Sequence, residues 1–106
     1  MELGMLEQQV MLAILRLNPI AYGITIQQKI ADCTDRSPSI GAIYATLDRL
    51  EQKGFVVSRK GEVTAERGGK RKLYFTLTAP GQVTLQRSLQ ALDSMRRGIR
   101  WKEARA

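Results

Sequence analysis

The stretch SPSIGAIYATLDRLEQKGF, residues 37–55, decides the fold because it predicts a helix with one buried face and one free face. Its apolar residues recur at spacings of three, four and three, which places them on one side of a helix with 3.6 residues per turn: Ile40, Ile43, Leu47 and Leu50. The opposite side holds small and polar residues: Gly41, Ala42, Ala45, Asp48, Arg49 and Gln52, with Tyr44 at its margin. A large flat partner could therefore approach the backbone of this helix closely.

Both ends of this helix carry recognisable signals. Ser37 is the predicted N-cap and Pro38 the first helical residue, because a cap oxygen accepts an unpaired N–H and proline has none to leave unpaired. Gly54 is the predicted glycine just after the helix, and the apolar run that begins at Phe55 predicts a strand.

The composition indicates one small domain. The chain has 106 residues, 43% of them hydrophobic and 25% charged, which is typical of a soluble globular protein. No apolar run approaches the roughly 20 residues that a membrane span needs. Glu2 and Glu7 stand where a secretory signal would carry basic residues, so we expect a cytoplasmic protein without membrane contact.

The chain has no histidine and one cysteine, which removes the usual zinc sites, every histidine-dependent triad and any internal disulfide. Cys33 shares a helical face with Ile26 and Ile30, so we expect it to be a buried core thiol. No paired carboxylates, phosphate loop or metal-ligand arrangement is present, so we expect neither an enzyme nor a cofactor.

The net charge of +7 is distributed unevenly. Residues 1–52 carry four basic and six acidic groups, residues 53–72 carry seven and two, and residues 73–106 carry six and two, giving −2, +5 and +4. The basic block follows the free-faced helix directly, which favours a surface that meets a polyanion.

Two further helices precede residue 37. Residues 5–17 form the first, with Leu6, Val10, Ala13 and Leu17 on one stripe and Met11, Ile14 and Leu15 on the next, too wide an apolar surface for one buried seam. Such a helix is either central in the core or shared with a second subunit. A second helix is expected over about residues 24–33, which makes a helix-turn-helix layout with the stretch 37–55.

A hairpin and a last helix complete the prediction. The strands cover about residues 55–60 and 71–78, the polar tip of residues 61–70 forms a wing, and the fold class is mostly α with a small β-hairpin (α+β). Thr78 caps a helix from about residue 79 to 95 or beyond. Its apolar stripe needs a partner, which a second chain supplies as in a short coiled coil. We therefore divide the chain into a winged helix-turn-helix domain, residues 1–78, and a dimerisation helix with a polar tail, residues 79–106. The predicted dimer contacts are Leu6, Val10, Leu85, Leu89, Leu92 and Ile99.

Four segments together resemble the PadR family of winged helix-turn-helix transcription regulators: Leu3-Gly4 with Leu6-Glu7, AYGITIQQKI, SIGAIYATLDRLEQKGFV and GGKRKLYFTLTAPGQ. The resemblance covers about residues 3–97, and the single last helix is similar to that of the smaller members. It implies a homodimeric repressor that binds an inverted-repeat operator in double-stranded DNA and is released by a small molecule or another signal. Two related helices would enter successive major grooves about 34 Å apart.

The candidate DNA contacts come from three places. Ser39 and Gly41 can offer a hydroxyl and backbone N–H groups to phosphate, Ala42, Ala45 and Arg49 face the groove, and the wing supplies charge. The full set is Tyr22, Ser39, Gly41, Ala42, Tyr44, Ala45, Arg49, Lys60, Lys70, Arg71 and Lys72, with Arg67 as a further wing charge.

Several of these residues have a second interpretation. Arg49 either pairs with guanine or forms a solvated contact with Asp48 or Gln52, and Tyr44 either contacts phosphate or packs at the edge of the apolar stripe. The wing charges either meet phosphates or only keep the chain soluble. For Trp101 we favour packing or a frayed position over an effector platform. The alternative function is a winged-helix module that binds another protein and no DNA.

Overall fold

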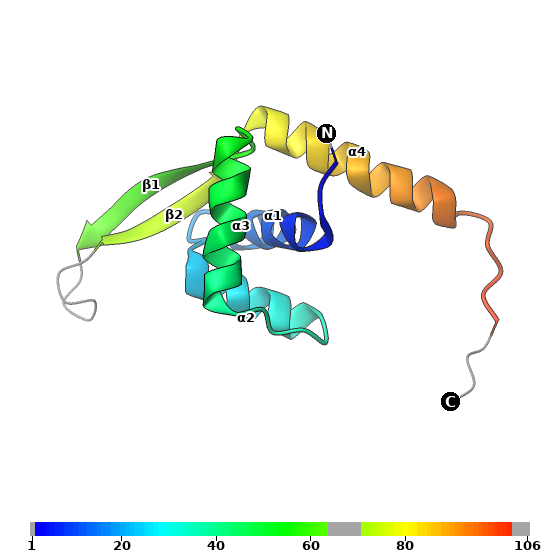
Figure 1. Ribbon diagram of the computed structural model, residues 1–106, viewed down its shortest axis with the longest axis horizontal. Helices are drawn as coiled ribbons and strands as arrows, with labels where there is room; N and C mark the ends of the chain where they lie inside the picture. The colour runs from blue at the N-terminus through cyan, green and yellow to red at the C-terminus, as the bar shows by residue number, and fades with distance from the viewer. Residues whose placement is uncertain (1, 64–70, 103–106) are drawn as a thin grey trace.

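The computed structural model of the chain describes residues 2–63 and 71–102, and within these ranges it consists of helices and one antiparallel hairpin (Figure 1). The order is α1 (Met5–Leu17), α2 (Gly23–Cys33), α3 (Ile40–Gln52), β1 (Val56–Val63), β2 (Arg71–Leu77) and α4 (Ala79–Arg96). Figure 1 shows the hairpin and α4 extending in opposite directions from the body that α1, α2 and α3 form. The predicted α+β fold with a winged helix-turn-helix arrangement is confirmed.

Helix α1 lies at the centre of the body and packs against α2, α3 and β2. Val10, Met11 and Ile14 are almost completely buried, which explains why the apolar surface of α1 is wider than one seam. Leu12 and Leu15, on the outer side of the helix, stay 37% and 44% exposed. One side of α1 therefore fills the core, and the other side stays exposed and available to a second subunit.

Helix α3 begins later than its sequence signals predicted. The N-cap is Ser39, whose Oγ accepts a hydrogen bond from the N–H of Ala42 at 3.1 Å, so the predictions for Ser37 and Pro38 are wrong. Pro38 instead belongs to the loop before the helix, where its carbonyl accepts from Gln27 Nε2 at 2.8 Å. Either Ser37 or Ser39 can act as an N-cap. The hydrogen bond from Gln27 of α2 holds Pro38 in the loop, so the cap is Ser39.

The end of α3 is the predicted glycine stop. Gly54 has φ +79°, its N–H donates to the carbonyl of Glu51, and the N–H of Phe55 donates to the carbonyl of Leu50. This pair of bonds is a Schellman motif, which closes the last turn and needs a residue in the left-handed region. Phe55 is buried beside the end of α3, and the chain continues directly into β1.

The hairpin has one face toward the body and one face away from it. Val56 pairs with Leu77 and Ser58 with Phe75, and the buried members of these pairs fill the edge of the core. Leu73 lies on the same face further out and is 42% exposed, because the hairpin there has run past the body. The register shifts between Lys60 and Val63, where two residues of β1 oppose one of β2, which is a β-bulge.

Helix α4 starts in the core and then leaves it. Thr78 accepts from the N–H of Gly81 at 3.0 Å, as predicted, and Leu85 is 2% exposed. Leu89 is partly buried against the core, whereas Leu92 and Met95 are 60% and 79% exposed. Across the described residues, no helix combines the length and apolar character that crossing a membrane requires.

Cys33 is exposed, so the prediction of a buried core thiol is wrong. It shares its helical face with Ile26 and Ile30, but it is the last residue of α2. At that position it lines an open groove between α1 and α2, together with Leu12 and Ala13. Ile40, in the first turn of α3, departs in the same way and is 38% exposed. Helical periodicity predicts the direction of a side chain but not where along the helix the core ends.

Candidate nucleic-acid interface

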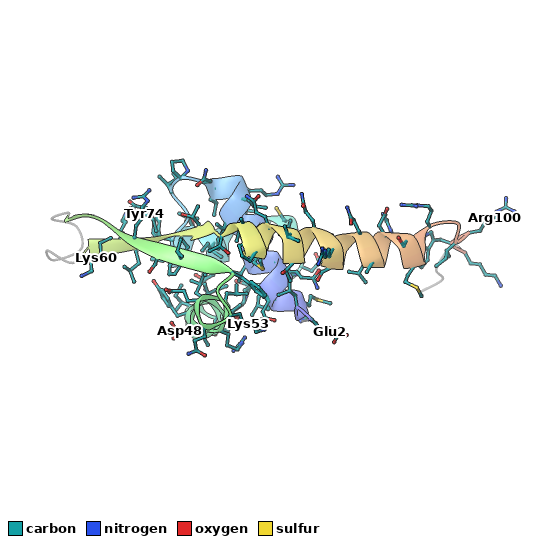
Figure 2. The ribbon with its side chains drawn as sticks, turned by 90° about the horizontal axis from the view of Figure 1, so that it is seen from above. Glu2, Asp48, Lys53, Lys60, Tyr74 and Arg100 are labelled. Atoms are coloured by element: carbon teal, nitrogen blue, oxygen red, sulfur yellow. The ribbon has the colours of Figure 1, made fainter. Side chains whose placement is uncertain are left out.

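The outer face of α3 is exposed along the whole helix. Ile43, Thr46, Leu47 and Leu50 face the core, so the opposite side presents Gly41, Ala45, Asp48 and Gln52, all exposed. Figure 2 shows Asp48 on the side of α3 that points away from the hairpin and α4. The short side chains at the first two of these positions leave the backbone of α3 accessible to a partner.

Contacts at both ends fix the position of α3. At its start, Gln27 of α2 holds the carbonyl of Pro38, and Ser39 caps the first turn. At its end, Lys53, which Figure 2 shows beside α3, donates from Nζ to Glu7 Oε2 at 2.6 Å and so joins α3 to the first turn of α1. The outer face of α3 is thus held in place by contacts to both α1 and α2.

Glu7 is a buried carboxylate with two tasks. Its Oε1 accepts from the N–H of Gly4 at 2.8 Å, which caps α1, while Oε2 pairs with Lys53. Burial by itself would raise the pKa of Glu7, but the hydrogen bonds from Lys53 and Gly4 and the positive charges of Lys53 and Arg49 outweigh it and lower the pKa below its ordinary value. The carboxylate therefore stays ionised at neutral pH.

Two candidate residues flank the outer face of α3. Tyr44 is 42% exposed, and its hydroxyl oxygen lies 2.5 Å from where a Cβ on Gly23 would be, so the ring rests on the start of α2. Arg49 lies on the other flank and donates to Thr46 Oγ1 at 3.1 Å, and not to the predicted partners Asp48 or Gln52. Thr46 in turn donates to the carbonyl of Ala42 at 2.8 Å. The side chains of Tyr44 and Arg49 therefore both contact the body and still reach the surface of α3.

On the hairpin face opposite to Phe75, a cluster of aromatic and basic side chains meets the connector between α1 and α2. The rings of Tyr22 and Tyr74 meet edge to face, with centroids 5.8 Å apart and planes at 89°. Arg59 Cζ lies 4.8 Å from the centroid of Tyr74, and Lys72 Nζ lies 4.4 Å from the centroid of Tyr22. We call these four residues the tyrosine–cation cluster.

The predicted contacts therefore fall into two groups. Ser39, Gly41, Ala42, Tyr44, Ala45 and Arg49 share the surface of α3, whereas Tyr22 and Lys72 belong to the tyrosine–cation cluster. Lys60 pairs with Leu73 and so lies on the same hairpin face as Phe75, toward α3. Lys70 and Arg67 lie outside the described residues, and of Arg71 only the pairing of its backbone with Val63 is described.

The predicted dimer contacts also divide. Val10 and Leu85 are 0% and 2% exposed inside one chain, so they belong to the core and cannot meet a second chain. They share a stripe with the exposed residues, which is why periodicity grouped them together. Leu6 and Leu89 are partly buried, and Leu92 and Ile99 are 60% and 50% exposed. Leu89, Leu92, Met95, Ile99 and Trp101 line one shallow apolar depression.

Three features were missed in the sequence, although each had a signal. Arg59 stands opposite Tyr74 in the hairpin register, which the strand alternation alone would have paired. Glu7 stands three residues after Gly4, the spacing of a capping box. Thr46 lies next to Leu47 on the inward side of α3, where a buried hydroxyl needs the carbonyl it finds.

In the described ranges, histidine, cysteine, aspartate and glutamate side chains form no group of three that could hold a metal ion. Helices α2 and α3 with the hairpin define a winged helix-turn-helix domain. Residues 11–87 match the model of the transcriptional regulator PadR-like family. The chain belongs to this family, whose members are regulators of transcription and not enzymes.

Solved structures give the same result. A protein assigned as a transcriptional regulator from Thermoplasma acidophilum is 26% identical, with a TM-score of 0.70, and the match covers 86% of this chain and 84% of the other. A PadR-like transcription factor from Bacteroides fragilis is 27% identical, with a TM-score of 0.74 and coverage of 88% and 84%. A PadR family transcription regulator from Clostridium difficile, 20% identical, matches in fold with a TM-score of 0.73 over 88% and 92%. No curated protein matches the sequence significantly.

Proposed function

We propose that the protein is a cytoplasmic, homodimeric repressor that binds an inverted-repeat operator in double-stranded DNA through the outer face of α3 and the hairpin. The observation that carries this proposal is the shape and chemistry of α3. Gly41 and Ala45 leave its backbone open, so the helix can enter a major groove without a steric barrier. Tyr44 and Arg49 stand at its two edges, where a groove brings phosphates and base edges.

The hairpin supplies the charge that attracts DNA. Its described part includes Arg59, Lys60 and Lys72, and residues 53–72 as a whole have a net charge of +5. Lys60 lies on the hairpin face toward α3 and is exposed, so it is the described wing residue best placed to meet a phosphate. Asp48 and Glu51 add negative charge to α3 itself, which makes close steric fit and the surrounding cations more important than the helix charge.

Two bare apolar surfaces support dimerisation. One is the second half of α4 with the residues that follow it, where Leu92 and Met95 are 60% and 79% exposed and Trp101, beyond the end of the helix, is 74% exposed. The other is the outer side of α1, where Met5 and Leu15 are 67% and 44% exposed. A second copy of the chain can bury both at once when α4 of each chain crosses α1 and α4 of its partner, and such two-fold symmetry matches an inverted repeat.

The regulatory part of the proposal is repression of a promoter and release by a small molecule or another signal, which we infer from the family. A ligand that binds the dimer better than the DNA complex would shift the population away from DNA, whatever its binding site.

The experiment that tests the proposal is a titration of the full chain with its own upstream DNA at several salt concentrations, followed by fluorescence anisotropy. Each phosphate that a cation neutralises contributes about −0.9 to the slope of log affinity against log salt. We expect a steep negative slope and a complex with two chains per operator. An affinity that does not fall with salt, or that is equal for unrelated DNA under all conditions, would contradict sequence-specific binding and favour a protein-binding module.

A further inference from the structure

The geometry points to the tyrosine–cation cluster as a positioning device that holds the hairpin at a fixed angle to α3, so that both meet DNA as one rigid surface. Its members are Tyr22, Arg59, Lys72 and Tyr74. The inference rests on the proposed function, because it explains how the cluster orients the hairpin for DNA binding although the cluster does not contact DNA.

The cluster joins the hairpin to the connector between α1 and α2. Arg59 lies over the ring of Tyr74 and also donates from Nη2 to the carbonyl of Pro19 at 3.0 Å. Beside it, the N–H of Phe75 donates to the carbonyl of Ala21 at 2.8 Å, so the connector borders β2 like a short extra strand. Lys72 on the ring of Tyr22 closes the other side, with Nζ 3.5 Å from the hydroxyl.

A path of contacts continues from the cluster to α3. Tyr22 is the N-cap of α2, and its N–H donates to Thr25 Oγ1 at 3.0 Å, which fixes the backbone there. The next residue, Gly23, is covered by the hydroxyl end of Tyr44 from α3. The three tyrosines of the chain thus connect hairpin, connector and recognition helix in sequence.

Two glycines make room for this arrangement. A Cβ on Gly61, at the bulge of β1, would lie 2.9 Å from Cδ2 of Tyr74 and closer still to Cε2, so the ring would have to move. A Cβ on Gly23 would lie 2.6 Å from Cζ of Tyr44. Aromatic rings seated directly on glycine backbone are held in one place by shape, which a positioning role requires and a solubilising face does not.

The charges of the cluster fit the same interpretation. Arg59, although exposed, lies over Tyr74 and hydrogen-bonds to Pro19, and Lys72 lies over Tyr22, whereas Lys60 belongs to the opposite hairpin face. The first two cations therefore hold the hairpin, and the third is left for phosphate. Cation–ring contacts gain strength when they are partly shielded from water, as the two half-buried tyrosines are.

The test compares Tyr74→Phe, Tyr74→Leu and Gly61→Ala in the full chain, with Val57→Ala as the matched control on the same hairpin face. None of these changes alters the charge, so a shallower salt slope reports a lost phosphate contact and not a lost cation. We expect Tyr74→Leu and Gly61→Ala to lower DNA affinity about tenfold and to make the slope shallower by about 1, as one phosphate contact would. Tyr74→Phe and Val57→Ala should behave as wild type.

Hydrogen exchange of the Phe75 amide, measured by NMR without DNA, provides the independent readout. It should quicken in Tyr74→Leu and Gly61→Ala and stay slow in Tyr74→Phe, while circular dichroism shows that the variants remain folded. Equal losses of affinity in Tyr74→Phe and Tyr74→Leu would overturn the inference, because the hydroxyl would then be a DNA contact. Wild-type affinity and exchange in folded Gly61→Ala would overturn it too. If the wild type bound no DNA, the proposed function would fail, and the exchange data would still decide whether the cluster holds the hairpin.

Discussion

The outer face of α3 and the second half of α4 both stay bare, and they differ in chemistry. The outer face of α3 presents Gly41, Ala45, Asp48 and Gln52, which are small or polar. The second half of α4 presents Leu92 and Met95 beside a tryptophan. Both surfaces project from the same small core. The difference teaches that exposure only marks a candidate interface, while its side chains separate the two partners we propose: DNA for α3, where small residues allow close approach, and a second apolar helix for α4.

The largest effect is expected from placing charge on the apolar surface. The double change Leu92→Asp with Met95→Asp should weaken dimerisation on the order of a thousandfold, because two carboxylates per chain would have to be buried in the dimer. Both residues are exposed in the single chain, so its fold should survive. Sedimentation velocity measures the association, and operator affinity should fall with it.

The control for this change uses the opposite side of α4. Gln90→Asp with Ser94→Asp adds the same charges to exposed positions of the same helix that face away from the stripe. This variant should remain dimeric. A dimer that persists unchanged in the Leu92 and Met95 variant would mean that another surface joins the two chains.

The next effect comes from placing charge on the other surface. Ala45→Glu should lower DNA affinity about a hundredfold, because a carboxylate would face the phosphates and the backbone could no longer approach closely. Its matched control is Ala31→Glu, which puts the same side chain on an exposed position of α2. Both variants should keep the melting temperature and the dimer of the wild type. If both bind DNA equally well, α3 is not the recognition helix.

A smaller effect concerns the buried pair that ties α3 to α1. Glu7→Gln should lower the free energy of unfolding at pH 7 by about 1–3 kcal/mol, since Lys53 then loses its charged partner. The pKa of Glu7 is lowered in the folded chain, so its contribution is complete above the ordinary value of 4.5 and is lost as the pH falls through the lowered pKa. Urea unfolding at pH 7 and at pH 3 should therefore show a difference between variant and wild type that shrinks in acid.

Asp93 offers the comparison for this pair. Its pKa is lowered by hydrogen bonds from Arg96 and Arg97, but all three side chains are exposed on α4. Asp93→Asn should change stability far less than Glu7→Gln, because solvent screens exposed pairs. Equal losses in the two variants would show that Glu7 acts only as another surface charge.

The elements of the fold were predictable because each is encoded locally. The apolar spacing of α3, the stop at Gly54, the cap at Thr78 and the alternation of β2 all depend on neighbours within a few residues. The errors came where a long-range contact decides. Gln27 moved the start of α3 to Ser39, and the limit of the core left Cys33 exposed while it buried Val10 and Leu85.

The candidate site was predictable in part, for the same reason. The open face of α3 follows from periodicity, whereas the separate tasks of the hairpin cations depend on which face of the strand each one takes. Lys72 was predicted as a phosphate contact, and the structure adds that its ammonium lies over the ring of Tyr22. Only the tertiary arrangement distinguishes a cation that holds the wing from one that is free to bind.

That distinction gives the smallest and most specific effect. Lys60→Gln should lower operator affinity about threefold to tenfold and make the salt slope shallower by about 0.9, the value for one phosphate. Its control is Lys29→Gln on α2, which removes the same charge beside the groove between α1 and α2 and should leave the slope unchanged. Equal changes in the two variants would mean that the overall positive field, and not the hairpin face toward α3, draws the protein to DNA. A change confined to Lys60 would instead indicate that DNA lies along α3 and the hairpin together. The apolar surface of α4 would then stay available for contact with the second chain.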